Sequence, residues 1–112
     1  MSKQNMADAD ALTDSAFYIL MALLVPRHGY LIMQYVKEIS EGQFVIGPAT
    51  LYTMIKKLVK EEWIMLVDEV DRKKIYQITT SGEKMWQQDV ARRERMVNHA
   101  KLAKGLISDG KK

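Results

Sequence analysis

Apolar residues in the first half of the chain recur at helical spacing. Residues 16–24 are apolar at nearly every position, which is typical of a helix buried on most sides. Thr13 offers an N-cap for this helix, and we expect the helix to end at Pro26. A turn at residues 27–29 follows. Apolar side chains then return every three or four positions over residues 30–40, and this period predicts a second helix.

A third helix is predicted to begin at Gly47-Pro48, because proline is well tolerated in a first helical turn. One side of this helix is apolar and would pack into a core. The opposite side is small at its N-terminal end, which lets its backbone approach another molecule closely, and it is cationic further along. The residues on or beside this outward side are Ala49, Thr50, Tyr52, Thr53, Lys56, Lys57 and Lys60.

Two runs of β-branched and aromatic residues, at 63–67 and 75–79, predict strands. The charged stretch at 68–74 between them predicts the tip of a β-hairpin. Three consecutive cations lie near this tip, as contact with phosphates would require: Arg72, Lys73 and Lys74.

A long helix is predicted from Lys84 to about Lys104, opened by a capping box of Thr80 and Glu83 and broken at Gly105. Apolar residues form one stripe along it: Met85, Trp86, Val90, Met96, Val97, Ala100, Ala103 and Ile107. Such a stripe past the end of a small domain needs a partner. We expect it to pair with a second copy of the chain; folding back onto its own domain is the alternative.

Arg93 lies inside this stripe, where burial requires an acidic partner such as Asp89 or Glu94 of the other chain. The predicted helix at 16–24, which includes Phe17, is apolar on nearly every side. We therefore expect this helix to pack against the long helix across the dimer.

Length and composition fit a single domain without catalytic chemistry. The 112 residues are 47% apolar, and the longest charge-free run, Ser15 to Pro26, is too short to span a bilayer. The absence of cysteine excludes disulfides, thiolate zinc sites and cysteine nucleophiles. His28 and His99 lack metal-site spacing, and there is no glycine-rich phosphate loop. We expect a cytoplasmic protein that is not an enzyme and binds no metal or cofactor.

The net charge of +3 is unevenly distributed along the chain. Residues 1–55 carry three basic and five acidic side chains, a net charge of −2, whereas residues 56–112 carry 14 and nine, a net charge of +5. Such unevenness points towards a polyanionic partner, although many charged faces are merely solvated.

Three helices followed by a β-hairpin are the components of a winged helix-turn-helix. In this domain the third helix enters the major groove of DNA, and the hairpin, or wing, reaches the adjacent backbone. We therefore expect a mainly α-helical fold with a β-hairpin wing and a long C-terminal dimerisation helix. The predicted parts are a tail at 1–12, the DNA-binding domain at 13–80, the dimerisation helix at 81–107 and a tail at 108–112. A winged helix that binds another protein instead of DNA is the alternative.

Three segments carry a family resemblance: His28-Gly29-Tyr30, residues 49–58, and residues 74–82 at the exit from the wing. Together they resemble the PadR family of bacterial transcriptional regulators, over about residues 15–104. Two features depart from the family pattern. Glu62 stands where the family usually has glycine, which implies a helix end of another geometry, and the wing loop is short and lacks glycines.

The resemblance implies a homodimeric repressor of a pseudo-palindromic double-stranded DNA operator, with the long helix pairing the protomers. It also implies a small aromatic effector, which relatives hold between protomers beside a tryptophan. Here the comparable position falls near Arg93, and the only tryptophan of the long helix, Trp86, comes two turns earlier. Met85, Trp86 and Met96 can still line an apolar pocket, because methionine adapts its shape; a methionine-rich dimer core is the alternative.

Overall fold

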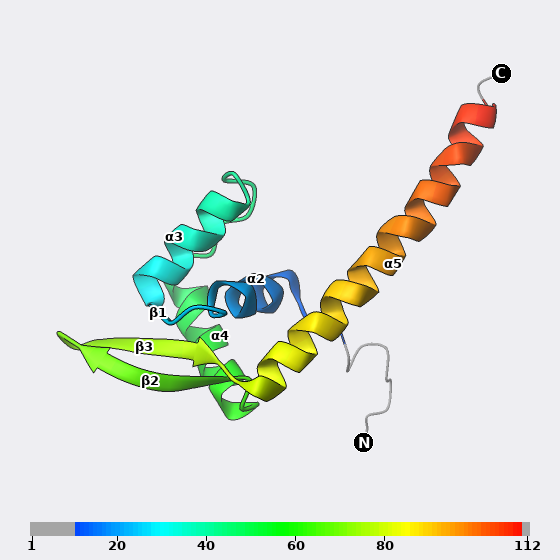
Figure 1. The fold of residues 1–112 in the computed structure, drawn as a ribbon. Helices are drawn as coiled ribbons and strands as arrows, with labels where there is room; N and C mark the ends of the chain where they lie inside the picture. Colours follow the sequence, from blue (N-terminus) through cyan, green and yellow to red (C-terminus); the bar gives the residue numbers. More distant parts are fainter. Residues whose placement is uncertain (1–10, 111–112) are drawn as a thin grey trace.

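Helices dominate the part of the chain that the structure, a computed structural model, describes: residues 11–110, with side chains as far as residue 107. The elements follow one another (Figure 1) as α2 (Asp14–Ala22), β1 (Arg27–His28), α3 (Gly29–Ile39), α4 (Pro48–Lys60), β2 (Ile64–Val70), β3 (Lys73–Ile78) and α5 (Thr80–Gly110). The predicted fold class, mainly α-helical with a β-hairpin wing, is confirmed. Of the predicted tails at 1–12 and 108–112, residues 1–10 and 111–112 lie outside the described residues, and residues 108–110 belong to α5 and not to a tail.

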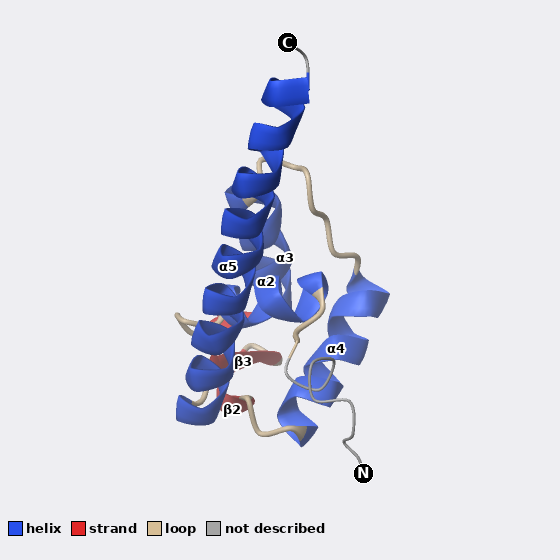
Figure 2. Cartoon of the chain, turned by 90° about the vertical axis from the view of Figure 1, so that its right-hand side faces the viewer, coloured by secondary structure: helices blue, strands red, loops and turns tan. Residues whose placement is uncertain are grey.

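The core lies where α2, α3 and α4 meet the base of the hairpin. α2 lies between α4 and α5 in both views (Figures 1 and 2), which explains why it is apolar on nearly every side. On α4 the apolar side is buried at Leu51, Ile55 and Leu58, whereas Val59, which the helical period places on the same side, is exposed. The helical period therefore predicted the packing side of α4 correctly except at its edge.

The predicted ends of the first helix are half right. Thr13 is the N-cap of α2, and its hydroxyl accepts a hydrogen bond from the Ala16 amide at 3.1 Å. The C-terminal end comes at Ala22 and not at Pro26, because Leu23 leaves helical geometry with its side chain still in the core.

The sheet has three antiparallel strands in the order β1-β3-β2. The predicted turn at 27–29 is wrong. Arg27 and His28 form the short strand β1, paired with Tyr76 and Ile75 of β3. A strand of two residues has no period of its own, and only its partner defines it.

The hairpin strands are longer, and the tip is shorter, than predicted. Only Asp71 and Arg72 form the turn, and both have positive φ, 52° and 66°. These angles are those of a two-residue type I′ hairpin turn, which matches the twist of the strands. The remaining charged residues of the predicted tip lie in paired strands, with Glu69 opposite Lys74.

The end of α4 corrects the geometry expected at Glu62. Glu62 has a φ of 64°, the left-handed conformation that glycine would adopt there. Its amide donates to the Val59 carbonyl at 2.9 Å, and the Trp63 amide donates to the Leu58 carbonyl at 3.0 Å. This is the usual Schellman helix end, built with a glutamate in the strained position.

α5 is longer than predicted at both ends. Thr79 caps it, because its hydroxyl accepts from the Gly82 amide at 3.0 Å, so the predicted capping box of Thr80 and Glu83 is wrong by one residue. Gly105 does not break the helix, which continues to Gly110 and projects away from the other elements (Figures 1 and 2). Within residues 11–110, no helix is long and apolar enough to cross a membrane.

Gly82 fixes the start of α5 against the base of the wing. A Cβ atom at this position would overlap the backbone carbonyl of Trp63, and it would come within 2.8 Å of the Ile78 side chain. The hydroxyl of Thr79 also donates to the Glu62 carbonyl at 2.7 Å. The first turn of α5 is therefore held closely to both α4's end and the hairpin.

Candidate nucleic-acid interface

The outward side of α4 is exposed as predicted. All seven residues assigned to this side have exposed side chains: Ala49, Thr50, Tyr52, Thr53, Lys56, Lys57 and Lys60. The N-terminal half of this surface is small and carries hydroxyls, and the C-terminal half carries the three lysines. We call these seven residues the α4 surface.

A cleft of about 510 Å³ separates α4 from the wing. It brings Tyr52 and Lys56 of the α4 surface together with the three wing cations Arg72, Lys73 and Lys74. The other five residues of the α4 surface lie outside the cleft. Residues distant in sequence thus line one cationic hollow between the helix and the hairpin.

Five further residues of this cleft were not among the predicted site residues: His28, Gly29, Tyr30, Ile55 and Tyr76. His28 and Tyr30 flank the start of α3, and Tyr76 lies on β3 opposite Arg27. The His28-Gly29-Tyr30 turn was visible in the sequence, and its place beside α4 depends on the pairing of β1 with β3. Among the described side chains, no three His, Asp or Glu residues are grouped to hold a metal ion.

Gly29 allows Tyr52 to lie across the start of α3. A Cβ atom on Gly29 would lie 2.5 Å from the Tyr52 hydroxyl oxygen and 3.0 Å from its ring carbon. Any side chain at position 29 would therefore displace Tyr52, which is the aromatic residue of the α4 surface. This close approach gives a physical reason for the glycine.

The cations of the interface form no ion pair within 4.0 Å among the described side chains. Among the described side chains, every ion pair within 4.0 Å involves Arg92 or Arg93 of α5. The α4 lysines are therefore available to an external anion. The wing differs, since its three cations share the hairpin with Asp68, Glu69 and Asp71, and its net charge is zero.

The residues predicted for dimerisation divide into those partly buried within the chain and those exposed further along α5. Phe17, Met85 and Trp86 are partly buried against the core of their own chain, and the Phe17 and Trp86 rings stack with centroids 5.8 Å apart. Val90 and Arg93 are half-buried, whereas Met96, Val97 and Ala100 are exposed. The first helix therefore packs against the first turns of α5 within the chain, and its packing across a dimer stays a prediction.

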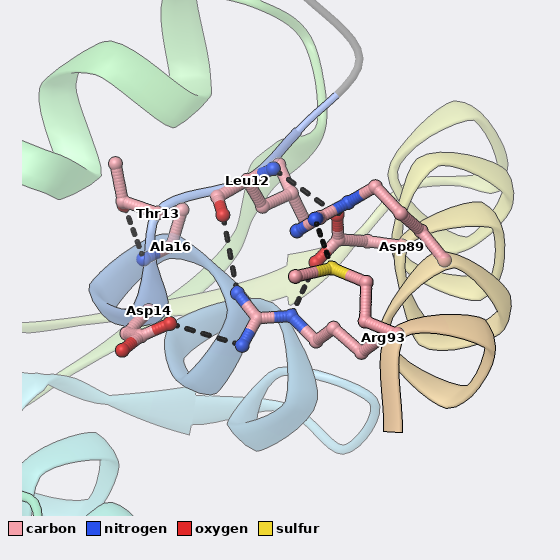
Figure 3. A network of polar contacts seen from close by, with 8 residues as sticks. Leu12, Thr13, Asp14, Ala16, Asp89 and Arg93 are labelled. Atoms are coloured by element: carbon pink, nitrogen blue, oxygen red, sulfur yellow. Dashed lines mark hydrogen bonds and ion pairs between the residues drawn. The ribbon is translucent and has the colours of Figure 1, made fainter. Parts of the chain in front are cut away.

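The predicted partner of Arg93 is corrected. Arg93 pairs with Asp89 of its own chain at 2.7 Å and with Asp14 of α2 at 2.9 Å (Figure 3). The i, i+4 spacing of Asp89 and Arg93 makes the first pair possible within one helix. Two exposed leucines on α5 lay outside the predicted stripe, Leu102 and Leu106.

The fold and this interface define a winged helix-turn-helix protein, with α3 and α4 as the helix pair and β2–β3 as the wing. The sequence model of the "Transcriptional regulator PadR-like family" matches residues 19–88, from α2 into α5. This match covers more than half of the chain, and the chain belongs to that family. The family is one of transcriptional regulators and not of enzymes. No curated protein shows a significant match.

Solved structures support the same class. A transcriptional regulator from Clostridium thermocellum is 26% identical, with a TM-score of 0.67 over 77% of this chain and 88% of that one. A PadR-like transcription factor from Bacteroides fragilis is 22% identical, with a TM-score of 0.65 over 77% and 88%. Sso10a-2, a DNA-binding protein from Sulfolobus solfataricus, is 17% identical, with a TM-score of 0.60 over 81% and 90%. The last two show likeness of fold.

Proposed function

We propose that this protein is a homodimeric, sequence-specific repressor that binds a pseudo-palindromic operator in double-stranded DNA. The observation that carries the proposal is the α4 surface, exposed and without carboxylate partners, which continues across a cationic cleft into the wing. Membership of a family of transcriptional regulators supports it, and the repressor role rests on that membership alone.

Within this proposal the α4 surface divides into two parts. Ala49, Thr50 and Thr53 are small enough for the helix backbone to approach base edges, and the hydroxyls can bond to them. Lys56, Lys57 and Lys60 neutralise phosphates along the groove. Tyr52 and the wing residues Arg72, Lys73 and Lys74 face the strand of DNA that would enter the cleft.

The dimer is supported by the free end of α5. Every described side chain from Glu94 to Ile107 is exposed, and several of them are apolar: Met96, Val97, Leu102, Leu106 and Ile107. Pairing with a second copy would remove this surface from water. A twofold axis through paired helices would present two α4 surfaces to half-sites about 34 Å apart, or a multiple of that.

Selection from random duplex DNA tests the function. The purified chain is incubated with a randomised duplex library, and retained DNA is sequenced over successive rounds. We expect an enriched inverted repeat, and its symmetry would report the dimer as well. Enrichment of no sequence, together with recovery of a protein partner from an extract, would instead favour a winged helix that binds proteins.

A small aromatic effector is the second part of the proposal. A hollow of about 560 Å³ between α2 and α5 is lined by Phe17, Val90, Arg93 and Val97, among others. Its aromatic ring and apolar side chains suit a planar aromatic ligand. Titration of salicylate into the protein–operator complex should release the DNA if the hollow holds such an effector.

A further inference from the structure

One carboxylate among the described side chains is buried, and it is paired with two arginines. Asp89 on α5 has no exposed surface and is the only buried polar or charged residue among the described side chains. One of its oxygens accepts from Arg92 Nε at 2.8 Å and from the Leu12 amide at 3.2 Å, and the other accepts from Arg93 Nε at 2.7 Å. The carboxylate is thus fully used by three donors, two of them cationic.

Arg93 extends this arrangement from α5 to α2. Its Nη1 atom donates to Asp14 at 2.9 Å, and its Nη2 atom donates to the Leu12 carbonyl at 3.1 Å (Figure 3). Its guanidinium carbon lies 4.2 Å from the centre of the Phe17 ring. Leu12, placed in the predicted tail, is buried by these contacts and by the core. We call Asp89, Arg93, Asp14 and Leu12 the α2–α5 clamp.

The clamp includes Arg93, the last residue of α5 that is not exposed among the described side chains. From Glu94 onward every described side chain is exposed, and α5 extends away from the other elements (Figure 1). Residues 93–107 extend about 20 Å at 1.5 Å per residue, so a tilt of about 10° at the clamp displaces the far end by about 3.5 Å. That displacement is close to the 3.4 Å rise of about one base pair.

We propose that Arg93, held by Asp89 and reaching Asp14 and Leu12, is a positioning residue that sets the angle between α5 and the DNA-binding domain. Given the proposed function, this angle sets the separation of the two α4 surfaces in the dimer. Arg93 therefore determines which half-site spacing the protein accepts, although it touches no DNA itself.

Arg92 supplies a matched control. Both arginines donate to Asp89 from the same helix, but the other hydrogen bond of Arg92 goes to Met96 of α5 and does not reach α2. Arg93→Met removes the hydrogen bonds to Asp14 and Leu12 and keeps an unbranched apolar side chain. Arg92→Met removes an equivalent bond to Asp89 and leaves the bonds to Asp14 and Leu12 in place.

Distances within one chain test the angle directly. The chain has no cysteine, so Lys37→Cys on α3 and Lys104→Cys on α5 give two unique, exposed positions for spin labels outside the apolar surface proposed for dimerisation. Labelled protein is diluted with unlabelled protein, so that each dimer carries at most one labelled chain. Double electron–electron resonance spectroscopy then reports the distance between the two labels of a single chain. We expect Arg93→Met to broaden the distance distribution about twofold, as a loosened hinge would, and Arg92→Met to leave it unchanged.

Asp14→Ala provides a second test if Arg93→Met folds poorly. Asp14 is 66% exposed, and alanine removes the acceptor of Arg93 on α2 without touching the buried Asp89. We expect a broadening in the same direction, with the circular dichroism spectrum unchanged. A distribution as narrow as the wild type's in both variants would overturn the proposal.

Binding to duplexes with altered spacing tests the consequence. Half-sites are separated by the preferred spacing or by one or two base pairs more or fewer. We expect wild type and Arg92→Met to prefer one spacing, and Arg93→Met to lose that preference while its affinity for a single half-site stays unchanged. An unaltered spacing preference in Arg93→Met would overturn the role. If the wild type bound no duplex, the proposed function would fail, and the spin-label distances would still decide whether Arg93 sets the angle.

Discussion

The α4 surface and the α2–α5 clamp both depend on charged side chains, yet they use charge in opposite ways. The lysines of the α4 surface are exposed and have no carboxylate within 4.0 Å among the described side chains. In the clamp, each charge has a partner, and Asp89 has no exposed surface. An unpaired charge on the surface changes the free energy of unfolding little, and it is available to bind a ligand. Buried charge is tolerated only when it is fully paired, and it then fixes geometry.

The largest effect should come from breaking the clamp at its buried end. Asp89→Ala leaves two arginines without their shared carboxylate, and we expect it to lower the free energy of unfolding by about 3 kcal/mol. Lys56→Ala should change the same quantity by less than about 0.5 kcal/mol, because its side chain is exposed and unpaired. Urea denaturation followed by circular dichroism measures both. Equal losses in the two variants would contradict the distinction between the regions.

The clamp should also make stability depend on acid pH. Burial acts to raise the pKa of Asp89, but the hydrogen bonds from Arg92, Arg93 and the Leu12 amide outweigh it, so the pKa lies below its ordinary value. A carboxyl group whose pKa is lowered by folding stabilises the protein above its unfolded pKa of about 3.9, and this stabilisation is lost as pH falls through the folded pKa.

Comparison with Asp89→Asn isolates this contribution, since asparagine keeps the size of the side chain but does not titrate. Arg92 and Arg93 of α5, which donate to the carboxylate, remain in place. Between pH 7 and pH 3 we expect the unfolding free energy of the wild type to fall further than that of the variant. Parallel curves would mean that Asp89 has the same pKa in both the folded and unfolded states.

On the α4 surface the expected effect falls on DNA binding and not on stability. Lys56→Ala should weaken binding to all sequences alike and reduce the slope of log affinity against log salt by about 1, as expected for one lost phosphate contact. Lys37→Ala is the control, because Lys37 is an exposed lysine near the end of α3, outside the α4 surface. Fluorescence anisotropy across a salt series checks this, and equal slopes for the two variants would count against the assignment.

The smallest expected effect is on stability, at Glu62, where two substitutions distinguish the contribution of the charge from that of backbone strain. Glu62 adopts positive φ at the end of α4, so Glu62→Gly should raise the unfolding free energy by about 0.5–1 kcal/mol. Glu62→Ala removes the same charge but keeps a Cβ atom in the strained conformation, and it should give no such gain. Thermal denaturation of the three proteins distinguishes the two causes. A similar gain from alanine would assign the effect to charge.

Periodicity predicted the secondary structure well wherever the signal was local. The outward side of α4 follows from the 3.6-residue period alone, since Leu51, Ile55 and Leu58 must face inward. β1 escaped prediction because two residues have no period and gain their conformation from β3. Gly105 was read as a break, but one glycine costs only about 1 kcal/mol within a helix, and α5 continues through it.

The contacts of the candidate sites depended on tertiary structure to different degrees. The pairing of Asp89 with Arg93 can be predicted from their spacing of four residues. The position of Arg93 inside an apolar stripe pointed instead to a partner in a second chain. Its contact with Asp14 spans 79 residues of sequence, which no local pattern reports. The same holds for the cleft, where His28 and Tyr76 meet α4 only after the sheet has formed.

The absence of a side chain at Gly82 lets the base of the wing pack directly against the first turn of α5. The far end of the wing is the turn at Asp71 and Arg72. A longer loop inserted between these two residues would lengthen the hairpin while its root stays seated. The turn of the wing is thus a position where residues can be inserted or exchanged without altering the base of the hairpin.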